Sequence, residues 1–363
     1  MAQRSMLEFV RRDRDENAMG TEQPMFVDLF SGIGGASQGA VEAGYNVIVA
    51  VDSCEHALEV HRKNHLTTRH FCLELPTRVE LSLPAPGVRW HCHGSPPCTN
   101  VSRANQLRIE ERKEQGTRLV EWYLRFAMDS GATSWSMEQV PTPVVQEVLK
   151  KLRARKSPYR NRLAWTLVNF RDYGVPQYRK RIIAGSPDVI ARLKRLPLKR
   201  RGVREVVPVC RGTHVRNEVK WSDPRPAPEG HDHRYVYKLY GDDDCCIPVE
   251  KPGYCITARH TLRWATPGTG SKLLRMTPRE TALMQTFPGD YQLDENKQRA
   301  IRGIGNAIPP LIMKQILPPP PPPLLVAELV VRQEPVPGGG TPRAAGGVLD
   351  LAEGLRCGSP SLR

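Results

Sequence analysis

The stretch Phe26-Val27-Asp28-Leu29-Phe30-Ser31-Gly32-Ile33-Gly34-Gly35 joins an apolar run to a cluster of glycines. The apolar run over 25–30 predicts a strand, and the pattern over 35–43 predicts a helix that ends at Gly44. Glycines in a strand-to-helix turn let the backbone approach a ligand closely, because no side chain intervenes. The stretch lacks the Lys-Ser/Thr of a phosphate-binding loop and is not Gly-x-Gly-x-x-Gly. It therefore fits a phosphate-poor nucleoside ligand better than ATP or NAD.

Short apolar runs alternate with helical patterns after this turn. The sequence predicts a helix from about residue 54 and further strands over 46–52, 88–93, 134–137 and 181–184. Such alternation is typical of βαβ units, so we expect an α/β fold with a doubly wound, mostly parallel sheet. Asp52 ends the second predicted strand, where folds of this kind place a carboxylate on ribose hydroxyls. An acid at a strand end is also often merely exposed.

The periodicity changes towards both ends of the chain. Residues 1–23 are polar and aperiodic, which predicts a flexible leader. From about Pro187 the alternation is lost, which predicts an inserted lobe, and a helical pattern returns at the capping box of Thr277 and Glu280. Six consecutive prolines begin at residue 318, so we expect a Pro/Gly-rich disordered tail over 318–363.

The chain carries a formal net charge of +15. Residues 191–220 hold ten Lys or Arg against Glu205 and Glu218, about +8, which favours a polyanionic partner. A solvated basic surface is the other interpretation of a charge run. The nine cysteines are scattered behind an N-terminus without an apolar segment, and no window is long and apolar enough to cross a bilayer. We expect an intracellular protein without membrane association, in a bacterial cytoplasm or nucleoid, a virus-infected cell or a nucleus.

A candidate nucleophile lies in Gly94-Ser95-Pro96-Pro97-Cys98. Two prolines stiffen this loop and fix the direction in which the Cys98 side chain leaves it. A thiolate is a strong nucleophile, although a lone cysteine is more often a small buried hydrophobe. The nearby triplet 91–93, His-Cys-His, is not expected to bind zinc, because strand alternation sends its members to opposite faces. We expect no metal.

Two further motifs carry polar side chains with a chemical use. Glu138 ends an apolar strand, where its carboxyl group could bind the edge of a heterocycle or lie at the surface. Gln177, Arg179 and Arg181 alternate, so in an extended strand they share one face. Arginines in such a row could orient a carboxylate, a base carbonyl or a phosphate, or only decorate the surface.

In chain order, six motifs resemble those of the cytosine-5 DNA methyltransferase family. They are the glycine turn at 28–35, Pro-Pro-Cys at 96–98, Glu138-Gln139-Val140, the Gln177/Arg179/Arg181 row, residues 275–280 with 285–288, and Gly305-Asn306-Ala307-Ile308-Pro309-Pro310. The resemblance spans about 25–317. It implies a Rossmann-like S-adenosylmethionine-dependent methyltransferase fold with a smaller target-recognition lobe. The expected division is a leader (1–23), a catalytic and cofactor-binding domain (24–186), the lobe (187–270), a returning C-terminal segment (271–317) and the tail (318–363).

The resemblance also implies a covalent reaction on a cytosine flipped out of duplex DNA. Cys98 would add to C6 of the base while Glu138 binds N3 and the exocyclic amine. Arg181 would hold the base carbonyl and Glu138, and Arg179 and Gln177 would shape the Cys98 loop. The chain departs from the family at Thr99 and Gln139, where the family usually has Gln and Asn; slower or altered catalysis is expected at worst.

The implied cofactor is S-adenosyl-L-methionine. Phe30 would stack on the adenine, the turn from Gly32 to Gly35 would pass beneath the methionine part, and Asp52 would bind the ribose. Glu74 would meet the adenine edge, and Asn306 would complete the pocket as the C-terminal segment returns beside the glycine turn. The whole expected pocket is Asp28, Phe30, Ser31, Gly32, Gly34, Gly35, Asp52, Glu74, Pro96 and Asn306.

Two other functions are compatible with these motifs. A tRNA-methylating branch shares most of them, so the substrate could be RNA, and a catalytically silent nucleic-acid-binding scaffold is the other alternative. The retained Cys98 favours an enzyme, and the length of the lobe mildly favours DNA. We expect a monomer. The bases around the target cytosine, a maintenance or de novo preference, and a restriction-modification, viral or epigenetic role are not determined by one sequence.

Overall fold

The computed structural model describes residues 23–76, 84, 88–97, 109–207, 213–218, 235–237, 246–258, 262–265 and 272–319. Several sequence-based expectations concern residues outside these ranges. Among them are the nucleophile Cys98 with Thr99, the leader up to residue 22, the tail from residue 320, and much of the expected recognition lobe.

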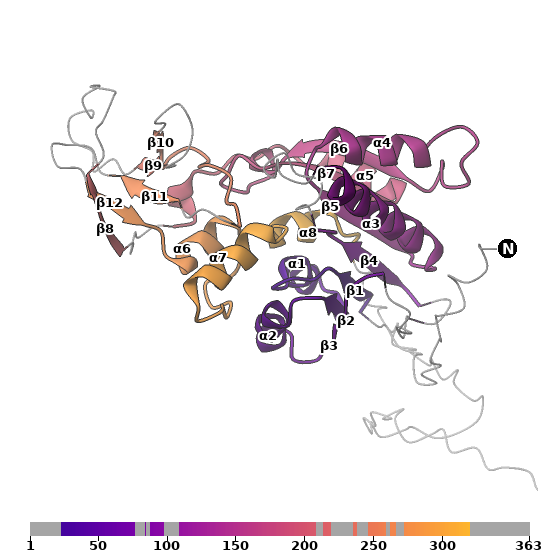
Figure 1. Ribbon diagram of the computed structural model, residues 1–363, viewed down its shortest axis with the longest axis horizontal. Coiled ribbons are helices and arrows are strands. Elements are labelled where there is room, and N and C mark those ends of the chain that lie inside the picture. The colour runs from indigo at the N-terminus through magenta and orange to yellow at the C-terminus, as the bar shows by residue number, and fades with distance from the viewer. Residues whose placement is uncertain are drawn as a thin grey trace, which may run out of the picture. The chain divides into compact units, whose positions relative to one another are not determined.

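A seven-stranded sheet carries the predicted α/β part of the chain (Figure 1). Its strands are β1 (Met25–Leu29), β2 (Asn46–Asp52), β3 (Arg69–Cys72), β4 (Trp90–Gly94), β5 (Ser134–Gln139), β6 (Ala164–Asn169) and β7 (Lys180–Gly185). The spatial order is β3-β2-β1-β4-β5-β7-β6. The first five strands in this order run parallel, whereas β7 runs antiparallel to both of its neighbours. The expected mostly parallel, Rossmann-like fold is confirmed.

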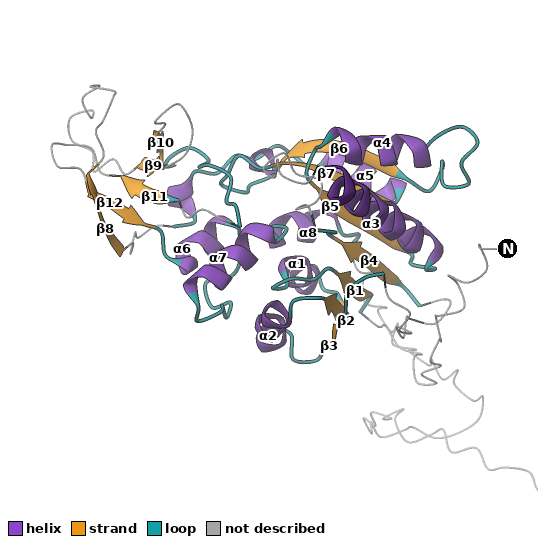
Figure 2. Cartoon of the chain, viewed as in Figure 1, coloured by secondary structure: helices purple, strands orange, loops and turns teal. Residues whose placement is uncertain are grey.

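Helices cover both faces of this sheet (Figure 2). On one face pack α1 (Gly35–Glu42), α5 (Pro187–Arg195) and α8 (Pro310–Ile316), and on the other α3 (Ile109–Asp129) and α4 (Pro143–Leu152). The short α2 (Glu55–Asn64) packs beside β2 and β3. Within β1 the side-chain alternation is visible, because Phe26 joins the core under α1 whereas Val27 and Leu29 join the core under α3.

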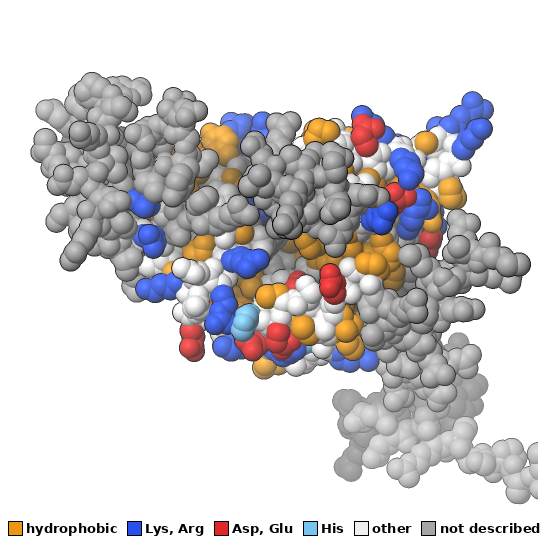
Figure 3. Space-filling view, viewed as in Figure 1, with side chains coloured by type: hydrophobic (Ala, Val, Ile, Leu, Met, Phe, Trp, Pro, Cys, Tyr) orange, Lys and Arg blue, Asp and Glu red, His pale blue; other side chains and the backbone are white. Residues whose placement is uncertain are grey.

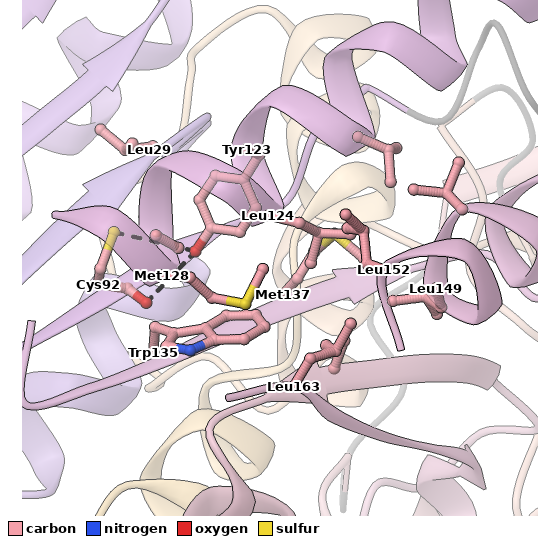
Figure 4. Close-up of a cluster of buried hydrophobic side chains, with 14 of the residues drawn as sticks. Leu29, Cys92, Tyr123, Leu124, Met128, Trp135, Met137, Leu149, Leu152 and Leu163 are labelled. Atoms are coloured by element: carbon pink, nitrogen blue, oxygen red, sulfur yellow. Dashed lines mark hydrogen bonds between the residues drawn. The ribbon is translucent and has the colours of Figure 1, made fainter. Parts of the chain in front are cut away.

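The core between the sheet and α3 is close-packed around Tyr123 (Figure 4). The Tyr123 hydroxyl donates to the Ser136 carbonyl oxygen at 2.7 Å and lies 3.3 Å from the Cys92 carbonyl oxygen. This buried phenol therefore has polar partners and avoids the cost of an unsatisfied hydroxyl. The same ring fills the space beside Gly94, where an added Cβ would come within 2.2 Å of it. The strand that leads to Pro-Pro-Cys is thereby fixed against α3.

The loss of periodicity expected from Pro187 begins later than predicted. Residues 187–195 form the amphipathic α5, with Pro187 in the first turn and Val189, Ile190 and Leu193 buried against the sheet. After the 3₁₀ turn Val203–Glu205, a separate five-stranded sheet follows. Its order is β10-β9-β11-β12-β8, formed by β8 (Thr213–Glu218), β9 (Tyr235–Tyr237), β10 (Cys246–Pro248), β11 (Arg263–Ala265) and β12 (Lys272–Arg275).

The C-terminal helices return to the main sheet. The capping box predicted at the start of α6 (Pro278–Met284) is present, because the Thr277 hydroxyl and the Glu280 carboxylate satisfy each other's backbone N–H groups. After α7 (Lys297–Asn306), α8 packs against α1 so closely that a Cβ on Gly39 would lie 2.2 Å from the Pro310 carbonyl oxygen. The segment after α7 thus lies against α1, the helix that follows the glycine turn.

The described surface carries charges of both signs. On the face seen in Figure 3, basic side chains (blue) are spread over several elements and acidic ones (red) lie among them. No helix in the described part of the chain is long and apolar enough to cross a membrane.

Candidate active site

Strand direction gathers the candidate residues at one edge of the main sheet. β1, β2, β4 and β5 are parallel, so the glycine turn, Asp52, Ser95-Pro96 and Glu138 all lie at or beyond their carboxyl ends. Because β7 runs the opposite way, its amino end with Arg181 lies at the same edge. β1 also lies between β2 and β4, the point where the winding changes direction and where α/β sheets bind their ligands.

The glycine turn has the conformation of a ligand cradle. Gly32 and Gly34 have φ values of 54° and 93°, in the left-handed region that favours glycine, and Phe30 adopts φ 60° without being glycine. A Cβ on Gly32 would meet nothing within 4 Å, so space lies open beside this residue. Ser31 is buried, and its hydroxyl has no hydrogen-bond partner among the described residues. The half-buried Phe30 ring lies edge-on to Tyr123.

Asp28 is a buried residue of β1, just before this turn. The carboxyl group is 1% exposed and accepts a 2.6 Å hydrogen bond from the Ser37 hydroxyl of α1. Burial raises the pKa of Asp28 to about 7, the Ser37 bond opposes this shift, and the charge of Asp52 adds to it. The Ser37 hydroxyl also lies 3.0 Å from Nε2 of buried His61. Asp28 thus joins β1 to α1, and its described bonds give it a place in the protein interior.

Asp52 connects the second strand to the glycine turn. One carboxylate oxygen accepts the Gly32 backbone N–H at 2.8 Å, and the other accepts that of Cys54 at 2.8 Å. Burial raises the pKa of Asp52, and these backbone bonds oppose the shift. Glu74 is exposed and follows β3, the neighbour of β2. Both carboxylates therefore lie at the carboxyl edge of the main sheet.

The segment before the nucleophile is held by β5. Pro96 is buried, and its carbonyl oxygen accepts a 2.9 Å hydrogen bond from the Gln139 side-chain amide. The other atom of that amide, Oε1, accepts the Val140 backbone N–H at 2.8 Å. Gln139, which stands where the family usually has Asn, thus still reaches the Pro-Pro segment despite its longer side chain. Cys98 itself lies outside the described residues.

Glu138 and Arg181 form a partly buried ion pair at the centre of the site. The Arg181 Nε lies 2.8 Å from the Glu138 carboxylate, with side chains 14% and 8% exposed. The Arg179 guanidinium lies 4.0 Å from the same carboxylate and is 2% exposed. Two guanidinium groups beside one carboxylate fix its direction.

Arg179 also connects this carboxylate to the C-terminal segment. Its guanidinium donates to the backbone carbonyls of Ile256 at 3.0 Å, Gly305 at 3.2 Å and Ala307 at 3.1 Å. Asn306, between the last two, is exposed and is the last residue of α7. Arg179 therefore connects Glu138 to residues 305–307, which lie far from it in the sequence.

Gln177 is placed differently from what its spacing predicts. β7 begins at Lys180, so the expectation of a single extended strand through 177–181 with one shared face is wrong. The Gln177 amide is fully buried and donates to the Met284 carbonyl oxygen at 3.1 Å and to Gln285 Oε1 at 2.6 Å. Its oxygen accepts the Ile256 N–H at 3.0 Å. Gln177 therefore joins the segment before β7 to α6 and to Ile256.

The described part of the basic stretch at 191–220 is divided in its roles. Arg200, Arg201 and Arg204 each lie near a carboxylate: Asp172 at 2.8 Å, Glu205 at 3.8 Å and Glu250 at 3.3 Å. The α5 arginine Arg192 donates to the Gln315 carbonyl oxygen at 2.8 Å. Part of the positive charge thus stabilises the fold locally.

A row of buried serines and histidines on β4 and β5 was not predicted from the sequence. His91 and His93 point to one face of β4, where they bond to Ser134 and Ser136 of β5, while Cys92 points to the opposite face, as the alternation predicts. The described residues contain no group of three His, Cys, Asp or Glu side chains arranged to hold a metal. His-x-His and Ser-x-Ser are visible in the sequence, but only the register of β4 against β5 shows that they meet.

Comparisons with known proteins agree with this geometry. The sequence profile of the C-5 cytosine-specific DNA methylase family matches residues 25–188 and 217–318, well over half of the chain. The type II methyltransferase M.HgiDI of Herpetosiphon aurantiacus is 25% identical over 294 residues, covering 78% of this chain and 89% of the relative. The type II methyltransferase M1.HphI of Haemophilus parahaemolyticus is 24% identical over 329 residues, covering 80% and 85%.

Two solved structures share the fold. A prophage-encoded DNA modification methyltransferase (E. coli) superposes with a TM-score of 0.53 at 16% identity, covering 81% of this chain and 97% of that one. The S. pombe Dnmt2 methyltransferase superposes with a TM-score of 0.51 at 15% identity, with the same coverage. The sequence profile, the order of the motifs and the fold agree, and the chain belongs to the C-5 cytosine-specific DNA methylase family.

Proposed function

We propose that this chain methylates C5 of cytosine in duplex DNA with S-adenosyl-L-methionine, through a covalent bond from Cys98 to C6 of the base. Family membership makes it a DNA cytosine-5 methyltransferase that needs a methyl donor. The observation that carries the finer proposal is the Glu138–Arg181 pair at the end of β5, next to the Pro96 segment that leads to Cys98. The donor, the form of the DNA and the residue roles are proposals.

The residues at the glycine turn fit an adenosyl donor. The space beside Gly32 is open, the Ser31 hydroxyl is buried without a partner among the described residues, and the Phe30 ring is half-buried at the same turn. An aromatic face and an unpaired hydroxyl beside open backbone suit a ligand with a base and polar groups. Asp52, Glu74, Gly34, Gly35, Pro96 and Asn306 would complete the pocket. Asp28 would contribute from β1, where one carboxyl oxygen is bonded to Ser37 and the other is buried without a hydrogen-bond partner among the described residues.

The donor, once bound, supplies an electrophilic methyl group. Cytosine is not nucleophilic enough at C5 to accept it directly, so the Cys98 thiolate would first add to C6 and leave electron density on C5. Glu138 would bind N3 and the exocyclic amine, and Arg181 would keep that carboxylate in place and meet the base carbonyl. After methyl transfer, loss of the C5 proton would return the electron pair that expels Cys98 from C6. Arg179 would hold Glu138 and residues 305–307 in one arrangement.

The second sheet and the basic residues around it would contact DNA. We place this recognition lobe after Arg195, because α5 packs on the main sheet. The returning segment 271–317 would complete the donor pocket. Lys194, Arg195 and Lys199 are exposed in the described part of the basic stretch and would suit phosphate contacts. A monomer is sufficient for this arrangement, because every proposed site residue comes from one chain.

A mechanism-based trap tests the proposal. Duplex DNA containing 5-fluorocytosine should give a denaturant-resistant adduct in the presence of S-adenosylmethionine, because fluorine cannot leave C5 as a proton does. Peptide mapping should place the adduct on Cys98, and Cys98→Ser should abolish it while still binding the donor. Methyl label on tRNA alone would overturn the DNA assignment. Intact folding with no adduct on varied DNA sequences would instead favour the silent scaffold.

A further inference from the structure

Five side chains form a continuous hydrogen-bonded row along β4 and β5. His91 Nδ1 lies 2.7 Å from Ser134 Oγ, and His91 Nε2 lies 2.8 Å from Ser136 Oγ. The same Ser136 Oγ lies 2.9 Å from His93 Nδ1, and His93 Nε2 lies 3.0 Å from Ser95 Oγ. We call these residues (Ser134, His91, Ser136, His93 and Ser95) the serine–histidine row. It begins at the amino end of β5 and ends one residue before Pro96.

The shared Ser136 hydroxyl limits the hydrogen-bonding arrangements that the row can adopt. Burial lowers the pKa of His93 to about 3 and that of His91 well below its usual value, so each imidazole is neutral and has one donor and one acceptor nitrogen. Ser136 has a single O–H and two lone pairs, so it can donate to at most one imidazole and must accept an N–H from the other or from both. The tautomers of His91 and His93 are therefore linked through Ser136. Whether Ser95 donates to or accepts from His93 depends on the tautomer of His93.

The imidazole rings are themselves held in place. Both stack on Phe26 of β1, with interplanar angles of 6° for His91 and 17° for His93. His91 and His93 are 0% and 1% exposed, and Ser136 is 0% exposed. Rotation of either ring would break a buried hydrogen bond and a stacking contact together. The row is therefore a rigid support whose last member, Ser95, is half-buried at the site.

We propose that the serine–histidine row positions the Cys98 loop, with Ser95 as the residue through which it acts. The row holds the Ser95 side chain from β4, and Gln139 holds the next carbonyl, that of Pro96, from β5. Two successive residues are thereby fixed just before Pro97-Cys98. This inference rests on the proposed nucleophilic role of Cys98, because small displacements of an attacking atom slow a reaction strongly.

The test compares three serine variants of the full chain. Ser95→Ala removes the last hydroxyl of the row, and Ser95→Thr restores a hydroxyl. Ser130→Ala is the matched control, because it removes a hydroxyl that bonds the Ala127 carbonyl and the Ala132 N–H at the end of α3, away from the site. The readouts are the single-turnover rate of adduct formation on 5-fluorocytosine DNA and the dissociation constant of S-adenosylmethionine. Unfolding midpoints show whether the alanine variants lose similar stability.

We expect Ser95→Ala to slow adduct formation at least about fivefold with donor affinity changed less than about twofold, and Ser95→Thr to recover most of the rate. Ser130→Ala should stay within about twofold of the unsubstituted protein in both readouts. An equal rate for Ser95→Ala and Ser130→Ala would overturn the positioning role while leaving the nucleophile intact.

A second readout does not depend on catalysis. The rate of alkylation of Cys98 by iodoacetamide, followed by peptide mass spectrometry, should rise at least about threefold in Ser95→Ala and not in Ser130→Ala. If the unsubstituted protein formed no adduct, the proposed function would fail, and this alkylation rate would still decide the role of the row. Unchanged alkylation would refute it.

Discussion

Replacing Asp28 by asparagine should make the protein's stability less dependent on pH between acid and neutral conditions. The Asp28 carboxyl is 1% exposed, and burial raises its pKa from 3.8 to about 7. A carboxyl group whose pKa is raised by folding contributes stability that is fully present below pH 3.8 and is lost as the pH rises through about 7. A carboxyl group whose pKa folding raises from 3.8 to about 7 changes the free energy of unfolding by about 4 kcal/mol between acid and neutral pH.

The assay is urea unfolding of the unsubstituted protein and of the Asp28→Asn variant at a series of pH values between about 4 and 8. The difference in free energy of unfolding between the two removes the effect of all other titrating groups. It should shift in favour of Asp28→Asn by about 4 kcal/mol over this range, because asparagine stays neutral. The amide can still accept from Ser37, while its new N–H donor adds a penalty that is independent of pH. A difference in free energy of unfolding that stays constant between about pH 4 and 8 would refute the argument that burial raises the pKa of Asp28.

Three further changes test other parts of the structure. Gly39→Ala should destabilise the protein by about 2 kcal/mol or more in urea unfolding, because the new Cβ would lie 2.2 Å from a backbone carbonyl of α8. Gly289→Ala is the control and should cost less than about 1 kcal/mol, because its Cβ would meet nothing within 4 Å. Equal costs for the two variants would contradict the close packing of α8 on α1. Glu280→Ala removes the capping box of α6 and the partner of the buried Trp264 indole nitrogen, which lies 3.1 Å from the Glu280 carboxylate. The variant should lose about 2 kcal/mol of stability in thermal melting. A loss under about 0.5 kcal/mol would show that neither bond stabilises the protein. Glu138→Gln should lower the single-turnover methylation rate about 100-fold or more without weakening donor binding in calorimetry. A rate within about threefold of that of the unsubstituted protein would show that this carboxylate takes no part in the chemistry.

The α/β fold could be predicted because its signals are local. Apolar runs of strand length, the glycine turn after β1 and the capping box before α6 each depend on neighbouring residues, and the structure confirms them. The helix α5 was missed because its Pro187 start and charged outer face resemble the irregular stretch that follows, although its buried residues have helical spacing. The strand predicted through 177–181 failed for a tertiary reason. Gln177 finds its partners in α6 and at Ile256, and these draw it out of the strand.

The sequence by itself determined the family, through the order of short motifs around Gly32, Cys98, Glu138 and Asn306, and it determined the sheet, through local periodicity. Only the tertiary structure decided which polar groups meet. Arg179 joins Glu138 to residues 305–307, Asp28 turns inward to Ser37, and paired strands align two histidines with two serines. Such partners are set by strand order and register between distant segments, and one chain's local pattern carries no information about either.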